Sequence, residues 1–369
     1  MSSIHEKYNL KQVLNCSGRM TILGVSTPTE SVAKAVNTGL NQYFEMKDLV
    51  IKSGEFIAQQ LEVEAAVVVS CASAGIAQSV AAMIVKDDLY RLEHLHAHPH
   101  DVPCEIVLPK GHNVNFGAPV GTMVTLGGGV IKEAGYANEC TKAHLSAAIT
   151  SKTAAILYIK SHHCVQKSIL SVQEAVQVAQ QHQLPLIVDA AAEADLKSYY
   201  QMGADLVIYS GAKAIEGPTS GLVVGRKQYI DWVRLQSQGI GRAMKVGKEG
   251  ILGLTQAIAE YYTRGHETGQ QMVAKMDIFV TTLNQIKGVS AQVVWDSAGR
   301  DIARTEITFD EALLGLSTAE IVSQLTATSP AVYCRCYKVN EGKIEIDVRS
   351  VEKSDLDIVS DKIKTILNP

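Results

Sequence analysis

Two residues with catalytic potential each follow a short hydrophobic run. Asp189 ends the run LPLIVDAA at 184–191, and Lys213 comes just after ADLVIYS at 204–210, beyond a turn at Gly211. They lie 213 − 189 = 24 residues apart. Taken singly, a lysine is usually a solvated surface residue and a strand-end aspartate is usually a cap. A pair at the ends of two sheet strands is more specific, because open α/β sheets build their sites there.

This pair suits pyridoxal phosphate (PLP) chemistry. An aspartate keeps the pyridine nitrogen protonated so that the ring accepts electrons, and a lysine forms the Schiff base. We therefore predict PLP as cofactor and both Asp189 and Lys213 as catalytic, cofactor-binding residues.

A phosphate site is predicted at the strand, small-residue turn and helix start of VVVSCASAGIAQSVAAMI, 67–84. Backbone amides of Ser73, Ala74 and Gly75 would face an anion at the start of that helix, with Ser210 as a further ligand. When this stretch is taken alone, an ordinary capped helix packed against a sheet is the better explanation. The sequence contains neither GxGxxG nor a Walker loop, so nucleotide binding is not indicated.

The elements around these residues alternate between strand and helix from about residue 60 to 260. Most of the hydrophobic runs lack polar alternation, as expected of strands buried on both faces of a parallel sheet. The predicted strands are 65–70, 104–109, 123–128, 154–160, 184–191, 204–210 and 220–227. The pattern predicts a doubly wound, mainly parallel α/β domain.

The pattern changes after residue 250. A methionine-rich helical stripe falls within a long helix predicted near 250–285, and short strands follow at 292–295, 304–309, 331–338 and 343–348, with a final helix at 355–367. We predict an N-terminal arm with first helices at 1–60, a large α/β PLP-binding domain at 61–260 and a small α+β domain at 261–369.

Composition narrows the class of protein. The 369 residues are 46% hydrophobic with a net charge of −4, so an electrostatically driven nucleic-acid binder is not indicated. We find no secretory signal and no hydrophobic run that could span a bilayer, and expect no membrane partner. Seven cysteines are too few for a disulfide framework; Cys334 and Cys336 are too close for a zinc knuckle and are interpreted as packing thiols. We predict a reduced, cytoplasmic protein.

The order of the motifs resembles that of bacterial selenocysteine synthase and its relatives, PLP enzymes of the aspartate-aminotransferase fold. The resemblance covers about residues 10–355 and is most specific at 203–226. The motifs that carry it are NCSG (15–18), VEAAVVVSCASAGIAQ (63–78), LPKGHNVNFG (108–117), VDAA (188–191), GADLVIYSGAKAIEGPTSGLVVGRK (203–227), GRAMKVGKEGILGL (241–254) and GKIEIDVRSV (342–351). It implies that Lys213 is the Schiff-base lysine and Asp189 the pyridinium partner.

Departures from the family pattern imply another substrate. The family's His-Thr/Pro-Ser-Asn-Tyr-Arg loop is replaced by HHCVQK at 162–167, SGDK has become SGAK, and the tRNA-gripping N-terminal domain is expected to be absent. A shorter branch of the family acts as ammonia-lyases on phosphorylated sugar amino acids. That resemblance predicts α,β-elimination on such a substrate by a homodimer or higher homo-oligomer. Aldol cleavage, selenium or sulfur transfer, and a non-catalytic regulator are the alternatives.

Three histidines are further candidates. His112 follows the strand at 104–109, where it can stack on the cofactor ring or move a proton, or simply bond to backbone. His162 matches the family's histidine and is predicted to act on the substrate as a catalytic acid. His163 is a predicted substrate contact.

Three cationic groups are predicted to bind substrate. Arg349, which the resemblance includes, offers a bidentate fork for a carboxylate, with an interdomain salt bridge as the alternative. Arg242 and Lys245, with Lys248 nearby, can hold the sugar phosphate or form a solvated helix face. Arg19 can reach the site of a neighbouring subunit.

A histidine-rich segment, HLHAHPH at 94–100, has alternate spacing that would suit a transition metal on one strand face. A solvated loop is the more frequent explanation for such a segment, and no metal is predicted.

Overall fold

The computed structural model describes residues 3–97, 101–161, 163–265, 267–296 and 299–367. Within them the chain divides into two compact units. The smaller unit combines residues 1–27 with 265–369, and the larger unit is residues 28–264. The segment predicted as an N-terminal arm, 1–60, is thus divided between the units: its first part pairs with the smaller unit, and its helices belong to the larger one.

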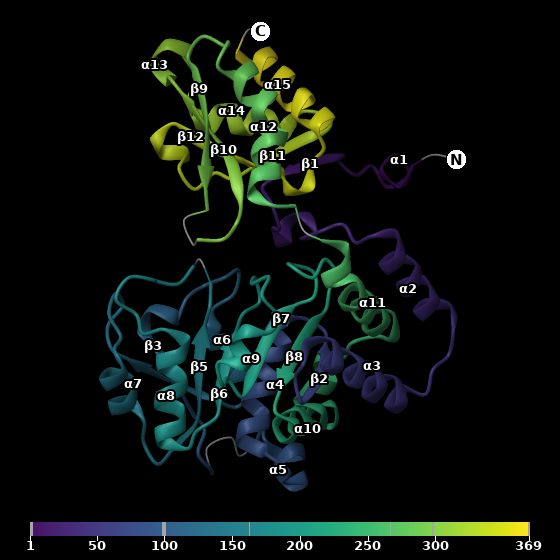
Figure 1. Cartoon of the computed structure of the whole chain (residues 1–369), viewed down its shortest axis with the longest axis vertical. Helices are drawn as coiled ribbons and strands as arrows, with labels where there is room; N and C mark the ends of the chain where they lie inside the picture. Colours follow the sequence, from purple (N-terminus) through teal and green to yellow (C-terminus); the bar gives the residue numbers. More distant parts are fainter. Residues whose placement is uncertain (1–2, 98–100, 162, 266, 297–298, 368–369) are drawn as a thin grey trace. The chain divides into compact units, whose positions relative to one another are not determined.

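The larger unit is built around a sheet that has seven strands in the described residues, in the order β2-β8-β7-β6-β5-β3-β4 (Figure 1). Its strands are β2 (Ala65–Val69), β3 (Glu105–Pro109), β4 (Val130–Ala134), β5 (Thr153–Ile159), β6 (Leu186–Asp189), β7 (Leu206–Ser210) and β8 (Gly221–Gly225). Only β8 runs antiparallel to its two neighbours; the other pairs are parallel. The predicted mainly parallel α/β fold is confirmed.

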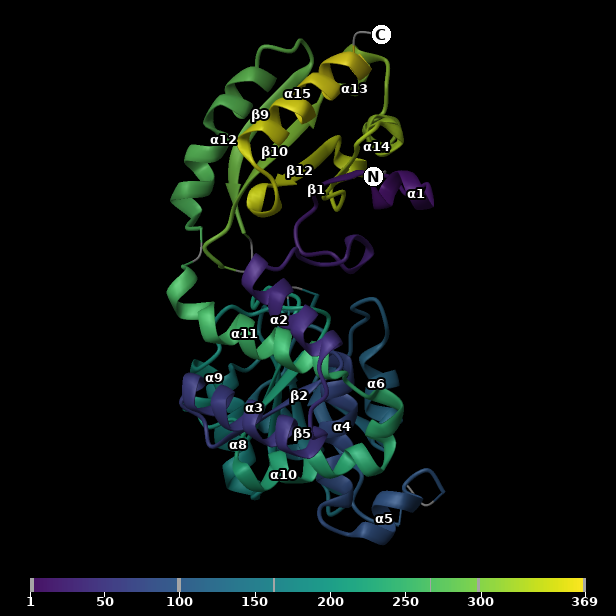
Figure 2. The same ribbon diagram turned by 90° about the vertical axis from the view of Figure 1, so that its right-hand side faces the viewer.

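Helices cover both faces of this sheet (Figures 1 and 2). One hydrophobic core contains side chains of α4 (Ala72–Val85), α6 (Val120–Leu126) and α10 (Lys227–Leu235). The opposite core contains side chains of α2 (Glu30–Asn41), α3 (Met46–Leu61), α7 (Lys142–Ala148), α8 (Val172–His182) and α11 (Lys248–Arg264). Strand residues alternate between the two cores, which explains why both faces of each central strand are hydrophobic.

Small residues let α4 approach the sheet closely. A Cβ on Gly75 would lie 2.9 Å from Cγ2 of Ile208 and 3.3 Å from Cγ2 of Val223. A Cβ on Gly221 would collide with the backbone of Cys71, at the cap of α4. The turn of small residues in the sequence therefore seats the start of this helix directly against β7 and β8.

The strand predicted at 123–128 is wrong. Residues 120–126 form helix α6, and the strand β4 starts only at Val130. A Cβ on Gly129 would lie 2.8 Å from Cγ1 of Val80 and 2.9 Å from Cγ1 of Ile106. The glycines that follow α6 therefore let the chain turn tightly against α4 before it enters the sheet.

The smaller unit carries its own hydrophobic core. In the part of the chain described, it contains a three-stranded antiparallel sheet, β12-β10-β9, and a parallel pair, β1-β11. Its elements are α1 (Ile4–Tyr8), β1 (Val13–Cys16), α12 (Gly269–Leu283), β9 (Val289–Trp295), β10 (Ala303–Phe309), α13 (Glu311–Leu314), α14 (Thr318–Ala327), β11 (Ala331–Cys334), β12 (Lys343–Asp347) and α15 (Lys353–Leu367). The methionine stripe of α12 is buried in this core, as predicted.

The single long helix predicted near 250–285 is wrong, because two helices, α11 and α12, occupy this range. Gly265 has φ +73 just after α11, a conformation that favours glycine. Thr268 and Gln271 then form a capping box that begins α12. Among the residues described, no helix is both long and hydrophobic enough to cross a bilayer.

Candidate cofactor and substrate site

The carboxyl ends of β2, β3, β5, β6 and β7 lie along one edge of the larger sheet, because these strands run in the same direction. The neighbouring parallel strands β6 and β7 bring the two predicted catalytic residues to this edge. The amide of Ala190 donates to the carbonyl of Ile208 (2.9 Å), and that of Ser210 donates to Ala191 (3.2 Å). The turn after Asp189 is thus tied to the strand that leads into Lys213.

Asp189 is a buried acid with 6% exposure. Its Oδ1 accepts one hydrogen bond from the amide of Ala191 (3.0 Å). Desolvation raises the pKa of Asp189 to about 6, against the opposing effects of that hydrogen bond and of the positive charge of Lys213. A cationic ring N–H of PLP is the kind of partner that would stabilise this carboxylate as an anion, so the residue fits the predicted cofactor.

Lys213 lies in a turn that is closed by backbone hydrogen bonds. The amide of Gly217 donates to the carbonyl of Gly211 (2.7 Å), and the amide of Gly211 donates to Ser220 (2.8 Å). Glu216, three residues after the lysine, forms an ion pair with Arg264 of α11 (2.9 Å). The lysine side chain is half-buried, on a loop held from both sides.

The predicted phosphate site is only partly available for an anion. The amide of Gly75 donates to the carbonyl of Cys71 (3.0 Å) and so begins the helical hydrogen bonds of α4. The amide of Ala74 donates to the Cys71 thiol at 3.3 Å, a weak acceptor. The amides of Ala72 and Ser73 precede the first helical bond, as at every helix start. Among the three predicted amides, Ser73 is therefore the best placed for phosphate, and Ser210 ends the adjacent strand β7.

His112 is almost fully buried, with 1% exposure. Its Nδ1 lies 3.2 Å from the amide of Ile159 and accepts its hydrogen, which puts the proton of the neutral ring on Nε2. The ring contacts Tyr158 edge-on, with centroids 4.5 Å apart. Burial, together with the charge of Lys160, lowers the pKa of His112 to about 4. At neutral pH this histidine is thus an uncharged N–H donor, and a poor source of protons.

The loop after β5 reaches the same edge. The amide of Lys160 donates to the carbonyl of Asp189 (2.8 Å), which places the two backbones side by side. His163 is exposed; desolvation and the charge of Lys213 lower its pKa. His162, the predicted catalytic acid, lies outside the described residues.

Arg242 and Lys245 are exposed residues of the segment that precedes α11. Lys248, considered with them for the sugar phosphate, has a structural contact instead. Its ammonium donates to the carbonyls of Leu40 (3.2 Å) and Gln42 (2.5 Å). Arg242 and Lys245 therefore remain the candidates for binding the substrate phosphate.

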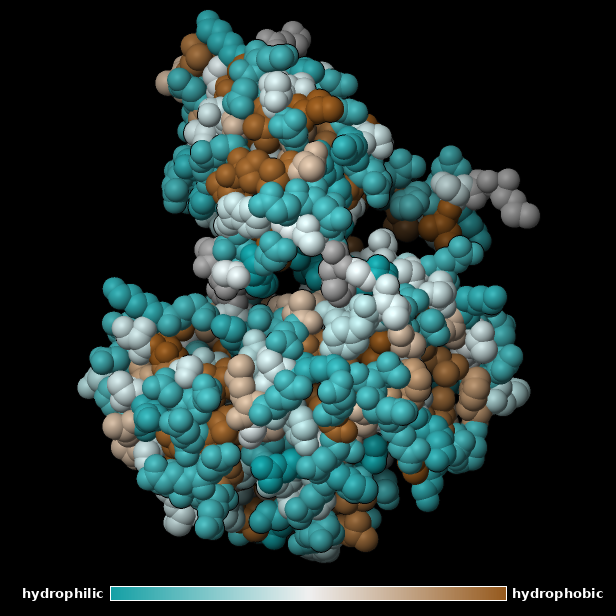
Figure 3. All heavy atoms as spheres, in the orientation of Figure 1, coloured by the Kyte–Doolittle hydropathy of each residue, from teal (hydrophilic) through white to brown (hydrophobic). Residues whose placement is uncertain are grey.

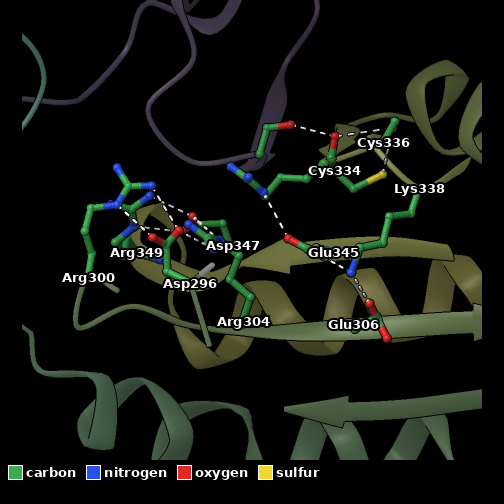
Figure 4. A network of polar contacts seen from close by, with 12 residues as sticks. Asp296, Arg300, Arg304, Glu306, Cys334, Cys336, Lys338, Glu345, Asp347 and Arg349 are labelled. Carbon is green, nitrogen blue, oxygen red and sulfur yellow. Dashed lines mark hydrogen bonds and ion pairs between the residues drawn. The ribbon is translucent and has the colours of Figure 1, made fainter. Parts of the chain in front are cut away.

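Arg349, in the smaller unit, lies in a local ion pair (Figure 4). Its Nε donates to Oδ1 of Asp347 (2.9 Å) and its Nη2 donates to Oδ2 (2.7 Å). Asp347 has 0% exposure and also accepts from Nε of Arg304 (3.0 Å). Asp296 in turn pairs with Arg304 and Arg300, each at 2.9 Å. Arg349 therefore forms a salt bridge within its own unit, which is a different contact from the interdomain salt bridge considered as the alternative to substrate binding.

Arg19 follows the NCSG loop, residues 15–18, which lies against the Asp347–Arg349 ion pair. A Cβ on Gly18 would be 2.8 Å from Oδ2 of Asp347 and 3.1 Å from Nη2 of Arg349, and Gly18 has φ +80. The NCSG motif thus requires glycine for two reasons, a positive φ and close contact with the buried carboxylate. Arg19 is half-buried directly after it.

The histidine-rich segment lies away from this chemistry. His94 ends α5 (Leu89–His94), where its ring stacks on Tyr90 at 4.2 Å and its Nδ1 bonds to the Tyr90 carbonyl. His96 is exposed, and His98 and His100 lie outside the described residues. Within the part of the chain that is described, no group of three or more His, Cys, Asp or Glu side chains could hold a metal.

Sequence reasoning missed three contributors: Lys160 beside Asp189, the Glu216–Arg264 pair that holds the lysine loop, and Asp347 behind Arg349. Lys160 carried a detectable signal, since it ends a buried strand as Asp189 does. The other two depend on partners that are distant in sequence or on burial, which the sequence alone does not show.

The family model for L-seryl-tRNA selenium transferase matches residues 103–312, more than half of the chain. The chain belongs to this family. A D-glucosaminate-6-phosphate ammonia lyase of Salmonella typhimurium is 42% identical over 99% of this chain and 98% of its own. A solved structure of D-glucosaminate-6-phosphate ammonia-lyase matches with a TM-score of 0.92 and 41% identity, over 100% of this chain and 98% of that one.

Two further proteins are similar to this chain at lower identity. A 5'-C-glycyluridine monooxygenase-decarboxylase of Streptomyces sp is 37% identical over 96% of this chain and 90% of its own. A Thermus thermophilus aspartate aminotransferase matches with a TM-score of 0.54 at 13% identity over 98% of this chain and 93% of that one, a likeness of fold alone. The predicted family, the aspartate-aminotransferase fold, an enzymatic role and PLP as cofactor are confirmed.

Proposed function

We propose that this protein is an ammonia-lyase that converts D-glucosaminate 6-phosphate, or a similar phosphorylated sugar amino acid, into a 2-keto-3-deoxy-6-phospho sugar acid and ammonia. The adjacency of Asp189 and the Lys213 loop on two parallel strands carries this proposal. The 42% identity with an enzyme of that name, over nearly the whole of both chains, supports the substrate class.

PLP would be held by Lys213, by Asp189 at its ring nitrogen and by the amide of Ser73 at its phosphate, and when bound it supplies an electron sink beside C2 of the substrate. Lys213, once free of the cofactor, removes the proton from C2, since a half-buried amine is a competent base. Asp189 would keep the ring nitrogen of PLP protonated, and that positive charge favours removal of the C2 proton.

Substrate orientation is proposed to use the cationic groups. Arg349 binds the carboxylate through the edge of its guanidinium turned away from Asp347, because the Nε–Nη2 edge already faces that residue. Arg242 and Lys245 bind the terminal phosphate, and Arg19 contributes to the site of a neighbouring subunit. These roles rest on residue chemistry and on the family resemblance.

The hydroxyl at C3 leaves as water after it receives a proton. His162 is proposed as the acid, and His163 as a substrate contact in the same loop. His112 orients the cofactor ring through its uncharged Nε2–H, because its lowered pKa disfavours proton delivery. The product released is a 2-amino-2-ene acid, which tautomerises and hydrolyses to the keto acid and ammonia.

A homo-oligomer is proposed as the working state. Large hydrophobic side chains are exposed on α2, α3 and the loop between them: Leu40, Tyr43, Met46 and Phe56, at 60%, 101%, 42% and 37%. Figure 3 shows hydrophobic residues at the surface on the side where Figure 1 places α2 and α3. We also propose a cytoplasmic location, because all seven cysteines are free thiols, as is usual in reducing compartments.

The test is to reconstitute the protein with PLP and add D-glucosaminate 6-phosphate under air and under argon. We expect a visible cofactor band that shifts with substrate, and keto acid and ammonia in equal amounts in both atmospheres. Lys213→Ala should lose both the band and turnover. Turnover that requires oxygen and releases CO₂ would instead favour the chemistry named for the 37% identical relative, and a band that ignores the compound would overturn the proposed substrate.

A further inference from the structure

Two sulfur atoms in the smaller unit lie in contact. Cys334 ends β11, and Cys336 follows two residues later, with their Sγ atoms 3.7 Å apart (Figure 4). Cys334 is 7% exposed in the core of the unit, whereas Cys336 is half-buried. One cysteine of the pair is thus partly exposed, and its sulfur contacts that of a buried cysteine.

The thiol of Cys336 differs in acidity from the buried cysteines, among which Cys334 also has a raised pKa. Burial raises the pKa of Cys140 to about 11 and the pKa of Cys164 to about 12, so these sulfurs stay protonated. The pKa of Cys336 is lowered, because the thiol of Cys334 can donate a hydrogen bond to the Cys336 thiolate. The lowered pKa favours the reactive thiolate of Cys336, whose thiol form donates instead to the carbonyl of Cys334 (3.4 Å).

We propose that Cys334 and Cys336 form a peroxide-oxidisable dithiol, with Cys336 as the sulfur attacked first and Cys334 as the resolving sulfur. The Cys336 thiolate attacks a hydroperoxide; an S–O bond forms, the O–O bond breaks, and water or an alcohol leaves. The Cys334 thiol then attacks the Cys336 sulfur, an S–S bond forms, and the sulfenic oxygen leaves as water. Two sulfurs lose two electrons in total, which the peroxide accepts.

Closing this bond requires a shift of Cys334, of Cys336, or of both. The sulfurs must approach from 3.7 Å to ~2.05 Å. The carbonyl of Cys334 accepts a hydrogen bond from Oγ of Ser17 (2.6 Å), which ties β11 to the NCSG loop. Gly18 of that loop contacts the Asp347–Arg349 pair. A shift of Cys334 is therefore transmitted through Ser17 to the position of Arg349.

The coupling from Cys334 to Arg349 affects catalysis only under the proposed function, in which Arg349 binds the substrate carboxylate. Oxidation should then raise KM for the sugar amino acid several-fold, leave the visible PLP band unchanged, and be reversed by dithiothreitol. The thiol chemistry itself can be measured without any activity, so a failure of the proposed function would leave it testable.

The chain offers a direct chemical readout. Trypsin cleaves after Arg304, Arg335 and Lys338, so Cys334 falls in peptide 305–335 and Cys336 in peptide 336–338. PLP-loaded protein is treated with hydrogen peroxide, freed of it, alkylated under denaturing conditions and digested. We expect the two peptides to be joined by a disulfide that dithiothreitol removes, while the other five cysteines (7 − 2) in the same digest are alkylated.

Two variants assign the roles. Cys334→Ser should leave a sulfenic acid on Cys336 that dimedone traps, and Cys336→Ser should leave Cys334 alkylatable after peroxide. The Cys336→Ser protein should also keep its KM after peroxide treatment.

Three results would overturn the proposal: no linked peptide at peroxide levels that oxidise an exposed model thiol, trapping on Cys334 in place of Cys336, or a link between 305–335 and peptide 12–19, which carries Cys16. Cys16 is the parallel partner of Cys334 in the β1–β11 pair, so this last link is the geometric competitor. A disulfide that forms without raising KM would refute the coupling to Arg349.

Discussion

Arg349 and Asp347 lie two residues apart and form a bidentate ion pair in which the carboxylate is fully buried, with 0% exposure. Arg304, itself 3% exposed, donates to the same carboxylate. Two arginines thus share one buried anion, and the guanidinium plane of Arg349 is fixed by it. A pre-organised arginine loses little conformational entropy when it binds a carboxylate.

Arg349→Lys should separate binding from stability. A lysine keeps the charge but loses the bidentate fork, so we expect KM for the sugar amino acid to rise about 10- to 100-fold, equivalent to about 1.4–2.8 kcal/mol. The thermal midpoint should change little, because one charge still faces Asp347. Steady-state kinetics and a melting curve on the same preparation check this. Arg335→Lys is a matched control, because Arg335 is also 15% exposed and paired to a carboxylate, Glu345; an equal rise in KM there would refute a special role for Arg349.

Asp347→Asn should lower the free energy of unfolding by about 1–3 kcal/mol at pH 7, because two arginines lose a shared buried carboxylate while Arg304 keeps its pair with Asp296. The ion pairs hold the pKa of Asp347 well below its usual range. Its stabilisation is therefore present above the unfolded pKa of about 4 and is lost as pH falls below it.

Urea unfolding of wild type and Asp347→Asn at pH 7 and pH 3 measures this window. The difference in stability between the two proteins should be smaller at pH 3. A difference that is equal at both pH values would mean that the charge of Asp347 is not its source.

Asp189→Asn should have opposite effects on the apo-protein and on catalysis. The raised pKa means that the folded apo-protein keeps the Asp189 proton up to about pH 6, whereas the unfolded chain loses it near pH 4. Apo stability should thus decline between these values as pH rises, by up to about 2–3 kcal/mol. The asparagine variant should lack this decline, yet bind PLP more weakly and turn over at least about 100-fold more slowly, since it holds no charge at the ring nitrogen.

Denaturant curves of both apo-proteins from pH 4 to 8, together with PLP titrations, provide the measurement. An apo wild type whose stability rises across this range would contradict the assignment of a protonated, desolvated Asp189.

His112→Gln should change the level of activity without changing its pH profile between pH 5.5 and 8. Because the pKa of His112 is lowered to about 4, the ring is already neutral in this range and contributes no ionisation there. We expect kcat to fall about tenfold, because the variant no longer orients the ring of PLP. If the variant removes an inflection near pH 6.5 from the kcat/KM profile, His112 titrates in the working enzyme and our role for it is wrong.

Much of the site follows from local patterns in the sequence. The unbroken hydrophobic runs before Asp189 and Lys213 predicted two buried strands, and parallel strands place their carboxyl ends at one edge wherever they occur in a sheet. The small-residue turn before α4 likewise predicted a helix start at that edge. Local pattern failed at 123–128, where glycines required for packing followed a hydrophobic run that resembles a strand but forms the end of α6.

The sequence by itself determined that the chemistry depends on PLP, because an aspartate and a lysine each follow a buried strand at the spacing that PLP enzymes need. Tertiary structure alone decided in which direction the pKa of each buried acid is shifted and which side chains are fixed by partners. Asp189 and Asp347 are both buried aspartates, yet the pKa of one is raised and that of the other is lowered. The difference arises because two arginines contact Asp347, whereas Asp189 has one backbone hydrogen bond and the charge of Lys213 against its desolvation. Such partners come from 43 residues away in the case of Arg304, and only folding brings them together.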